Sequence, residues 1–280
     1  IGPKELQFRV KLPIKILIIS LVVALILAAI GMIIETVRRA RKPPEKAGLE
    51  VVKHFTLSSS SEMKELDDKL LADSRTSYVI SEADGDKFLK AVSEDSASAL
   101  FYRHKLVPEK RPFVSWDWKA GKFPSRSKEE ALDKKDEFDF VAQFYVIFSS
   151  RFFLNAKAIQ YVWTENVPAG TVSDSPYTKN VKILVLESGM SEEWKHEERN
   201  INEDFEKLFE EELNEDVDAV ALMTDSDSTD TSAEAYFKDI KIGYLGALPG
   251  EKKSRMRKRR SKAERSKRFP FLKIKGAYTN

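Results

Sequence analysis

Residues 136–149 read D-E-F-D-F-V-A-Q-F-Y-V-I-F-S and carry the clearest periodic signal in the chain. The apolar side chains at the even-numbered positions are Phe138, Phe140, Ala142, Phe144, Val146 and Phe148. A period of two places successive side chains on opposite faces of a β-strand. We therefore predict one long strand over 136–149, with one apolar face and one mixed face.

Shorter segments on both sides of this stretch have a similar strand-like pattern. They are 50–57, 77–80, 99–107, 113–118, 158–163, 181–187, 217–224 and 235–244. Turn-rich segments separate them, and the pattern lacks the crossover helices that a parallel α/β sheet requires. The sequence therefore predicts an all-β sandwich or jelly roll that occupies residues 49–248.

Two short helices are expected within the sandwich. After Asn200, the side chains of Ile201, Phe205 and Leu208 form an apolar stripe, and Asn200 and Glu203 have the spacing of a capping box. The acidic residues on the opposite face are typical of a solvated helix surface. A second helix is predicted over 61–71, with Met63, Leu66 and Leu70 pointing inward.

The composition limits the chemistry open to the chain. The 280 residues include no cysteine, which excludes disulfides, thiolate nucleophiles and cysteine-ligated zinc. The three histidines lie at no metal-ligand spacing, and no G-x-S-x-G, phosphate-binding loop or H-E-x-x-H motif occurs. We therefore expect no catalytic residue. A polysaccharide-active enzyme stays an alternative, because its paired carboxylates have no local sequence signature.

An apolar run lies near the start of the sequence. Residues 16–34 carry no charge over nineteen positions, about 28 Å of helix and close to the roughly 30 Å core of a bilayer. We predict a single uncleaved transmembrane helix over 14–37, between a flank at 1–13 and a basic, proline-containing linker at 38–48. A signal peptide is the alternative, although its apolar region is usually about 7–15 residues. Basic residues flank the run on both sides, so charge leaves its orientation open.

The C-terminal segment 249–280 is strongly basic. Residues 251–268 hold eleven Lys or Arg against two Glu, so the rest of the chain has a net charge of −7. Such a segment cannot pack a core and requires an anionic partner. We predict contacts from Lys252, Lys253, Arg255, Arg257, Lys258, Arg259 and Arg260. Anionic lipid is favoured because the anchor keeps the tail beside a membrane. An acidic polymer or another subunit would also fit, and nucleic acid is less favoured.

Two groups of residues are candidates for a binding site. Asp225, Asp227, Thr229 and Asp230 concentrate hard oxygen ligands that could hold Ca²⁺ or contact a sugar, although the EF-hand template fails. The alternative is a loop whose side chains cap its own amides.

Tryptophans form the second candidate group. Trp116, Trp118 and Trp163 could form a stacking platform, but the shared face of Trp116 and Trp118 favours a place in the core. Trp194 lies beside a polar run and is the tryptophan most expected to be exposed. Trp194 and Trp163 are therefore the stacking candidates.

Several motifs resemble a bacterial family of uncharacterised domains that are usually exported behind an N-terminal signal or anchor. They are V-S-W-D-W-K at 114–119, D-E-F-D-F-V-A-Q-F-Y-V-I-F at 136–148, Y-V-W at 161–163, L-E-S-G at 186–189, E-R-N at 198–200, M-T-D-S-D-S-T at 223–229 and A-Y-F-K-D-I at 235–240. The resemblance implies a jelly-roll-like sandwich similar to carbohydrate-binding modules, on the periplasmic side of a bacterial membrane. It implies no activity.

These observations predict a membrane-anchored, non-catalytic β-sandwich. It would act as a binding module, with glycans as one ligand class, or as an accessory or structural subunit of an envelope or membrane complex. A cytoplasm-facing protein whose basic tail binds nucleic acid or anionic lipid is the main alternative, followed by a polysaccharide-active enzyme.

Overall fold

The computed structural model describes residues 48–150 and 156–246. The predicted membrane span at 14–37, its flank at 1–13, nearly all of the linker at 38–48 and the basic tail at 249–280 lie outside the described residues. Within the described part, no helix is both long and apolar enough to cross a bilayer. Residues Gly48–Ala247 form one compact unit.

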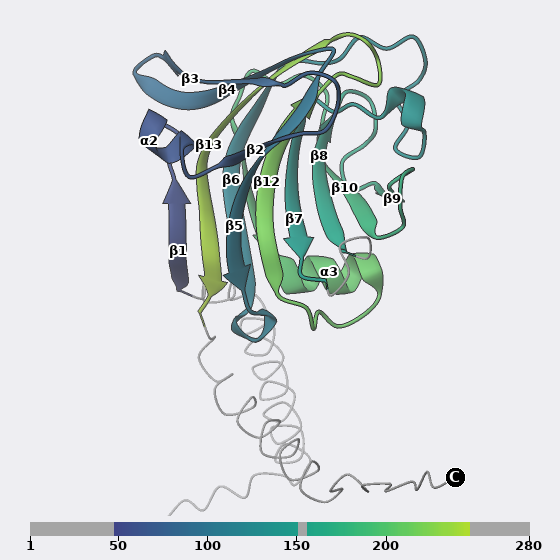
Figure 1. Ribbon diagram of the computed structural model, residues 1–280. Helices are drawn as coiled ribbons and strands as arrows, with labels where there is room; N and C mark the ends of the chain where they lie inside the picture. Colours follow the sequence, from purple (N-terminus) through teal and green to yellow (C-terminus); the bar gives the residue numbers. More distant parts are fainter. Residues whose placement is uncertain (1–47, 151–155, 247–280) are drawn as a thin grey trace, which may run out of the picture. The chain divides into compact units, whose positions relative to one another are not determined.

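Two β-sheets face each other and confirm the predicted sandwich (Figure 1). The first contains, in hydrogen-bonded order, β11 (Lys195–Asn200), β6 (Pro112–Lys122), β13 (Ser232–Leu245), β4 (Asp86–Glu94) and β3 (Ser77–Ala83), and β1 (Leu49–Phe55) pairs with β13. The second contains β2 (Asp67–Leu70), β5 (Ala97–Leu106), β12 (Val217–Asp225), β7 (Ala142–Phe148), β8 (Ala158–Thr164), β10 (Val181–Ser188) and β9 (Val172–Asp174). Strands β8 and β10 pair in parallel.

Strand β13 organises the first sheet. Its first half pairs with β4 and its second half with β1, while β6 runs along the other edge. The pairing joins Leu49 to Leu245 at the open end of β1, and the Gly246 amide donates to the Gly48 carbonyl at 2.6 Å. A side chain at Gly243 would collide with the backbone of Glu50, so close packing of β1 requires glycine at this position.

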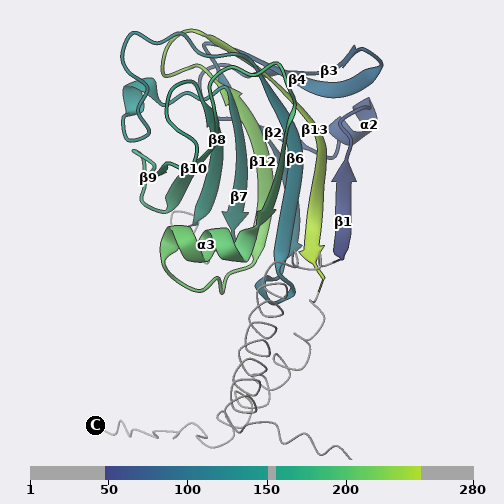
Figure 2. The same ribbon diagram turned by 180° about the vertical axis from the view of Figure 1, so that it is seen from behind.

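Aromatic side chains fill the space between the sheets. Trp116 on β6 stacks on Phe144 of β7 with centroids 4.1 Å apart and rings 4° from parallel. Helix α3 (Ile201–Phe209) closes one end of the sandwich, where its buried Phe205 packs on Phe148 (Figure 2). The helix was predicted correctly, but its capping box was not, because Asn200 donates to the Glu203 side chain at 2.5 Å and caps no backbone amide.

The predicted strand over 136–149 is correct only over Ala142–Phe148. Residues Lys135–Glu137 form the 3₁₀ turn η2, and an irregular segment follows to residue 141. The Phe140 amide donates to the Asp225 carboxylate at 2.8 Å. Phe138 and Phe140 keep the apolar alternation because they pack with Val162 on the outer side of the second sheet. Phe138 and Phe140 are buried on the outer side of the second sheet, whereas Phe144, Val146 and Phe148 are buried between the sheets. Together they give the sequence pattern of one continuous strand.

The helix predicted over 61–71 is also wrong. Only Ser60–Met63 are helical (α2), and β2 then adds to the edge of β5. The Glu62 carboxylate accepts the amides of Thr56 at 2.7 Å and Ser58 at 3.0 Å, which fixes the chain in a tight turn before β2. Strands β2, β4, β9 and β11 and the 3₁₀ turn η1 (Pro108–Lys110) were not predicted.

Candidate functional site

An aromatic patch lies on the outer face of the first sheet. We define it as Phe88 on β4, Tyr236 on β13 and Trp194 in the turn before β11. The ring centroids of Phe88 lie 5.3 Å from Tyr236 and 5.7 Å from Trp194, and those of Trp194 and Tyr236 are 6.4 Å apart. All three side chains are half-buried, so they present apolar surface on the outer face of the sheet.

Strand alternation explains why these rings converge. On β13, Ala235 and Phe237 point into the core, which turns Tyr236 outward. Leu89 on β4 is buried in the same way, and Phe88 faces outward beside Tyr236. Gly121 on β6 supplies the room, because a Cβ there would lie 2.9 Å from the Tyr236 ring. The absence of a side chain at Gly121 therefore leaves room for the Tyr236 ring.

Paired charges surround the aromatic patch. The Lys238 ammonium lies 4.4 Å from the Trp194 ring centroid and pairs with Asp86 at 3.2 Å. Lys119 lies 6.0 Å from the Tyr236 ring centroid, and the Tyr236 hydroxyl donates to Glu234. These contacts orient the rings and place hydrogen-bonding groups at their edges.

A histidine lies between two carboxylates on the same face. His196 Nδ1 is 2.5 Å from Asp117 and its Nε2 is 3.6 Å from Glu198. Burial lowers the pKa of His196, but the hydrogen bond and charge of Asp117 outweigh it and raise the pKa overall. This pair adds a charged, titratable group to the polar part of the face.

The side chain of Glu197 on β11 is on the opposite side of the strand from His196 and Glu198. Burial, and then the charge of Glu187 on β10, raise the pKa of the Glu197 carboxyl to about 7. A carboxyl whose pKa is higher in the folded state than in the unfolded chain binds more protons when folded. Its contribution to stability is therefore present below its ordinary pKa of 4.5 and is lost as the pH rises through about 7.

We predict that Glu197→Gln is more stable than the wild type at pH 8 and that the difference disappears near pH 4. The shift from 4.5 to about 7 sets an upper limit of roughly 3 kcal/mol, reduced because solvent reaches part of the side chain. Urea unfolding at several pH values measures it. Glu129→Gln, at an exposed position, is the matched control, and a difference independent of pH would contradict the prediction.

The structure keeps Asp225 and Asp227 of the predicted ligand site together but does not group Asp230 with them. Asp225 is buried at the end of β12, and its carboxylate accepts from Phe140 N at 2.8 Å and Gln143 Nε2 at 2.7 Å. The ligand atoms of Asp225, Asp227 and the buried Asp139 lie within 4.8 Å of one another. Asp230 does not belong to this trio, whereas the Thr229 hydroxyl bonds to Asp139.

Asp139 was missed as a member of this group because it lies far away in sequence. Its carboxylate accepts the amides of Ser228 at 3.1 Å and Thr229 at 2.8 Å, and the Thr229 hydroxyl at 2.6 Å. A distant carboxylate therefore caps the loop that was expected to cap itself. Burial and the charge of Asp139 raise the pKa of Asp225 well above its usual range and also raise the pKa of Asp227.

The trio could hold Ca²⁺, which prefers hard oxygen ligands, and the calcium hypothesis stays a prediction. Millimolar Ca²⁺ is then expected to raise the melting temperature, since ligand at about 10–100 times its Kd adds about 1.4–2.7 kcal/mol. Asp227→Asn should abolish the increase and Asp230→Asn should retain it. A melting temperature that does not change when Ca²⁺ is added would contradict the calcium hypothesis. It would mean that protons and hydrogen bonds alone stabilise these carboxylates.

The two stacking candidates, Trp163 and Trp194, differ in their exposure to solvent. Trp163 is fully buried, and its indole N–H donates to the Gly189 carbonyl at 2.9 Å, so its prediction as a stacking residue is wrong. Trp116 and Trp118 are core residues, as expected. Trp194 is the most exposed of the four tryptophans. The alternation of β13 could have revealed Tyr236, whereas Phe88 lies on a strand that was not predicted.

Comparisons with known proteins place the chain in a family context. Residues 66–241 match a family described as "Protein of unknown function (DUF3047)". The expected resemblance to an uncharacterised family is thereby confirmed. The chain matches no curated protein.

Several solved structures match the chain at low similarity. A family 11 carbohydrate-binding module from Clostridium thermocellum is 11% identical, with a TM-score of 0.37 over 72% of this chain and 97% of the module. The cellulose-induced protein Cip1 is 9% identical, with a TM-score of 0.38 over 71% of this chain and 100% of Cip1. A Bacillus subtilis protein of unknown function with a galectin-like fold is 8% identical, with a TM-score of 0.34 over 72% of this chain and 99% of that protein.

Proposed function

The chain belongs to the DUF3047 family of proteins of unknown function, and from its surface we propose that it is a non-catalytic glycan-binding module. The aromatic patch carries the proposal. Three rings from separate segments converge on one solvent-facing sheet surface, and core packing does not explain their position. Such a surface suits a ligand with apolar faces and polar edges.

Sugar rings have these properties. Their C–H groups pack on aromatic faces, while their hydroxyls bond to polar side chains around the rings. Lys119, Lys238 and Glu234 supply donors and acceptors at the edge of the aromatic patch. The contacts of Tyr236 with Glu234 and of Trp194 with Lys238 hold the rings in place before a ligand arrives, which lowers the entropic cost of binding.

The charges beside the aromatic patch support binding without catalysis. Glycoside hydrolysis requires two carboxyl groups placed on either side of one glycosidic bond. Glu234 pairs with Lys90 at 2.8 Å and Asp86 with Lys238 at 3.2 Å, so these two carboxylates are occupied by cations. A polysaccharide-active enzyme is therefore the second choice.

Glycan binding is tested by screening the detergent-purified full chain on immobilised polysaccharides and measuring affinity by calorimetry. Trp194→Ala is expected to weaken binding at least about tenfold, because it removes a stacking face. Leu71→Ala, which removes an exposed apolar side chain beside β2, is the matched control. If Trp194→Ala binds as well as the wild type, the aromatic patch is not the glycan site.

We further propose that the apolar run at 14–37 tethers this module to a bacterial membrane, with the module on the exported side. The length of the uncharged run supports the tether, and the family resemblance supports the side. Protease treatment of intact spheroplasts should degrade the module. Protection would favour the cytoplasmic alternative, in which the basic tail contacts nucleic acid or the inner leaflet.

A role as an accessory or structural subunit remains compatible with this proposal. Gentle detergent extraction followed by identification of co-purifying proteins, lipids and glycans would reveal stable partners. A chain that purifies alone would argue against the subunit role.

A further inference from the structure

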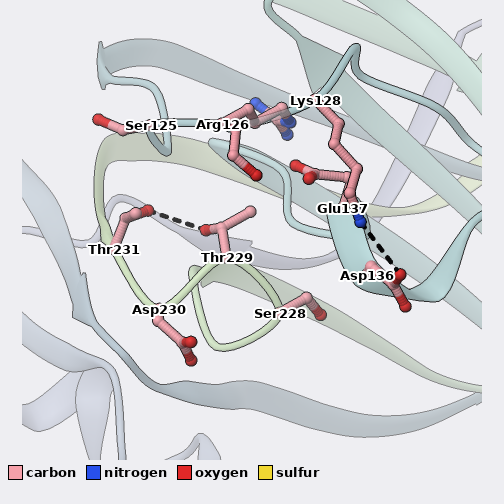
Figure 3. Close-up of a pocket in the computed structure, with 10 residues that line it drawn as sticks. Ser125, Arg126, Lys128, Asp136, Glu137, Ser228, Thr229, Asp230 and Thr231 are labelled. Carbon is pink, nitrogen blue, oxygen red and sulfur yellow. Dashed lines mark hydrogen bonds and ion pairs between the residues drawn. The ribbon is translucent and has the colours of Figure 1, made fainter.

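At the end of the sandwich opposite α3, the loop between β12 and β13 meets the segment after β6 (Figure 1). Side chains from both segments line a polar cavity there (Figure 3). Its volume is about 480 Å³. Arg126, Lys128, Asp136, Glu137, Thr229 and Asp230 belong to its lining. The volume is in the range of small-molecule sites, about 300–1,000 Å³, and far exceeds that of a single ion.

Buried contacts make one wall of the cavity rigid. The Arg126 guanidinium pairs with Glu130 at 3.1 Å, with side chains only 5% and 0% exposed. Glu130 also accepts the Asn166 amide at 2.7 Å, and Arg126 donates to the Asp139 carbonyl. The Arg126 guanidinium is therefore held by the Glu130 carboxylate and the Asp139 carbonyl before any ligand enters.

The charges around the cavity do not balance. Arg126 is paired with Glu130 and lies 3.8 Å from Glu165, and Lys128 pairs with Asp136 at 3.4 Å. Glu137 is 3% exposed, and its Oε2 has no hydrogen-bond partner. Figure 3 shows this carboxylate pointing into the cavity between Arg126 and Thr229. The unmatched charge inside the cavity is therefore negative.

Uncharged hydrogen-bonding groups lie beside this carboxylate. The hydroxyls of Thr229 and Thr231 are 2.8 Å apart on the facing wall (Figure 3). The buried Nε of Arg126 has no acceptor. A buried donor and a buried acceptor left without partners are costly unless a bound molecule satisfies both. A fitting ligand thus carries a cationic donor close to oxygen acceptors.

We propose that the cavity binds a protonated amino sugar, with its ammonium group at Glu137 and its hydroxyl oxygens at Arg126 Nε and the threonine hydroxyls. A single hexose ring suits the cavity volume, and the ammonium balances the unpaired carboxylate. This site lies apart from the aromatic patch and does not depend on it. The cavity would recognise one positively charged sugar unit, whereas the aromatic patch is proposed to bind sugar rings without requiring a charge on them.

The test is a calorimetric titration of the full chain with glucosamine. A chelator is present, so that no metal bound at Asp139 contributes to the signal. Saturable binding is expected, and glucose and N-acetylglucosamine, which lack the ammonium, should bind at least about tenfold more weakly. Glu137→Gln should weaken glucosamine binding at least about tenfold, because it removes the charge and keeps the shape. Glu129→Gln, an exposed neighbour outside the cavity, should bind as the wild type does.

Several results would overturn the proposal. They are no glucosamine binding by the wild type, equal binding of glucose, or unchanged glucosamine affinity in Glu137→Gln with a wild-type melting temperature. If Glu137→Gln melts early, Thr231→Val, which removes one of the proposed hydroxyl contacts, provides the second variant and should still weaken glucosamine binding. Glucosamine is titrated into both the wild type and Trp194→Ala, and only the binding that Trp194→Ala retains is attributed to the cavity, so failure of the aromatic patch and failure of the cavity can be told apart.

Discussion

Trp116→Ala is expected to lower the free energy of unfolding by about 3–5 kcal/mol, the usual cost of removing a large aromatic side chain from a core. Trp116 is fully buried and joins the two sheets through its stacking on Phe144. It also packs edge-on against Trp118, with centroids 5.4 Å apart, and lies 5.5 Å from Tyr161. No neighbouring backbone can move inward to fill the cavity, because hydrogen-bonded strands line it on both sides.

Chemical denaturation monitored by circular dichroism measures this loss. Trp194→Ala removes the same side chain from a half-buried position and is expected to cost much less, so it is the matched control. Domains are stable by about 5–15 kcal/mol, and Trp116→Ala therefore leaves a small margin. Trp116→Phe should give an intermediate loss if the alanine variant fails to accumulate. Equal losses for Trp116→Ala and Trp194→Ala would contradict the assigned packing.

Arg199→Met is expected to cost about 3 kcal/mol, because it leaves a buried carboxylate without its cation. The Arg199 guanidinium bonds to Asp204 through two nitrogens, at 2.7 Å and 2.5 Å, and Asp204 is 6% exposed. The Tyr161 hydroxyl donates to the same carboxylate at 2.7 Å. This pair fastens α3 to β11 and to the second sheet, which gives a structural reason for the E-R-N motif at 198–200.

The double variant Arg199→Met/Asp204→Leu should recover part of the lost stability, since it removes both charges together. Arg75→Met breaks the exposed Arg75–Asp68 pair, at 3.0 Å, and should cost less than about 1 kcal/mol. Urea unfolding of the four proteins measures all these effects. A loss in Arg199→Met no larger than that in Arg75→Met would show that the buried pair is not needed for stability.

Alternation in the sequence predicted strands such as β7 and β13 because their inward side chains are buried and their outward side chains are less so. It failed where burial has another cause. Phe138 and Phe140 alternate like strand residues, yet they cover the outside of the second sheet while the backbone amide of Phe140 bonds to Asp225. Local patterns report that a side chain is buried, but they do not report on which face.

The binding sites were harder to predict because their residues come from distant segments. Asp139 and Asp225 meet only after β7 and β12 have paired. Tyr236 depends on Gly121 of another strand for room, and Phe88 reaches the aromatic patch through the pairing of β4 with β13. Trp194 was identified from its polar neighbours alone. Sequence thus indicated single residues, whereas strand pairing determines which of them meet.

The pairing of β1 with β13 has a mechanical consequence. Gly48 and Gly246 lie side by side at one end of an antiparallel pair. Tension applied between these two points pulls the strands apart in the direction of their hydrogen bonds, so the bonds break one after another, starting at Leu49 and Leu245. Such unzipping needs less force than shearing all the bonds at once. The module would therefore lengthen gradually under load, with β1 acting as its first releasable segment.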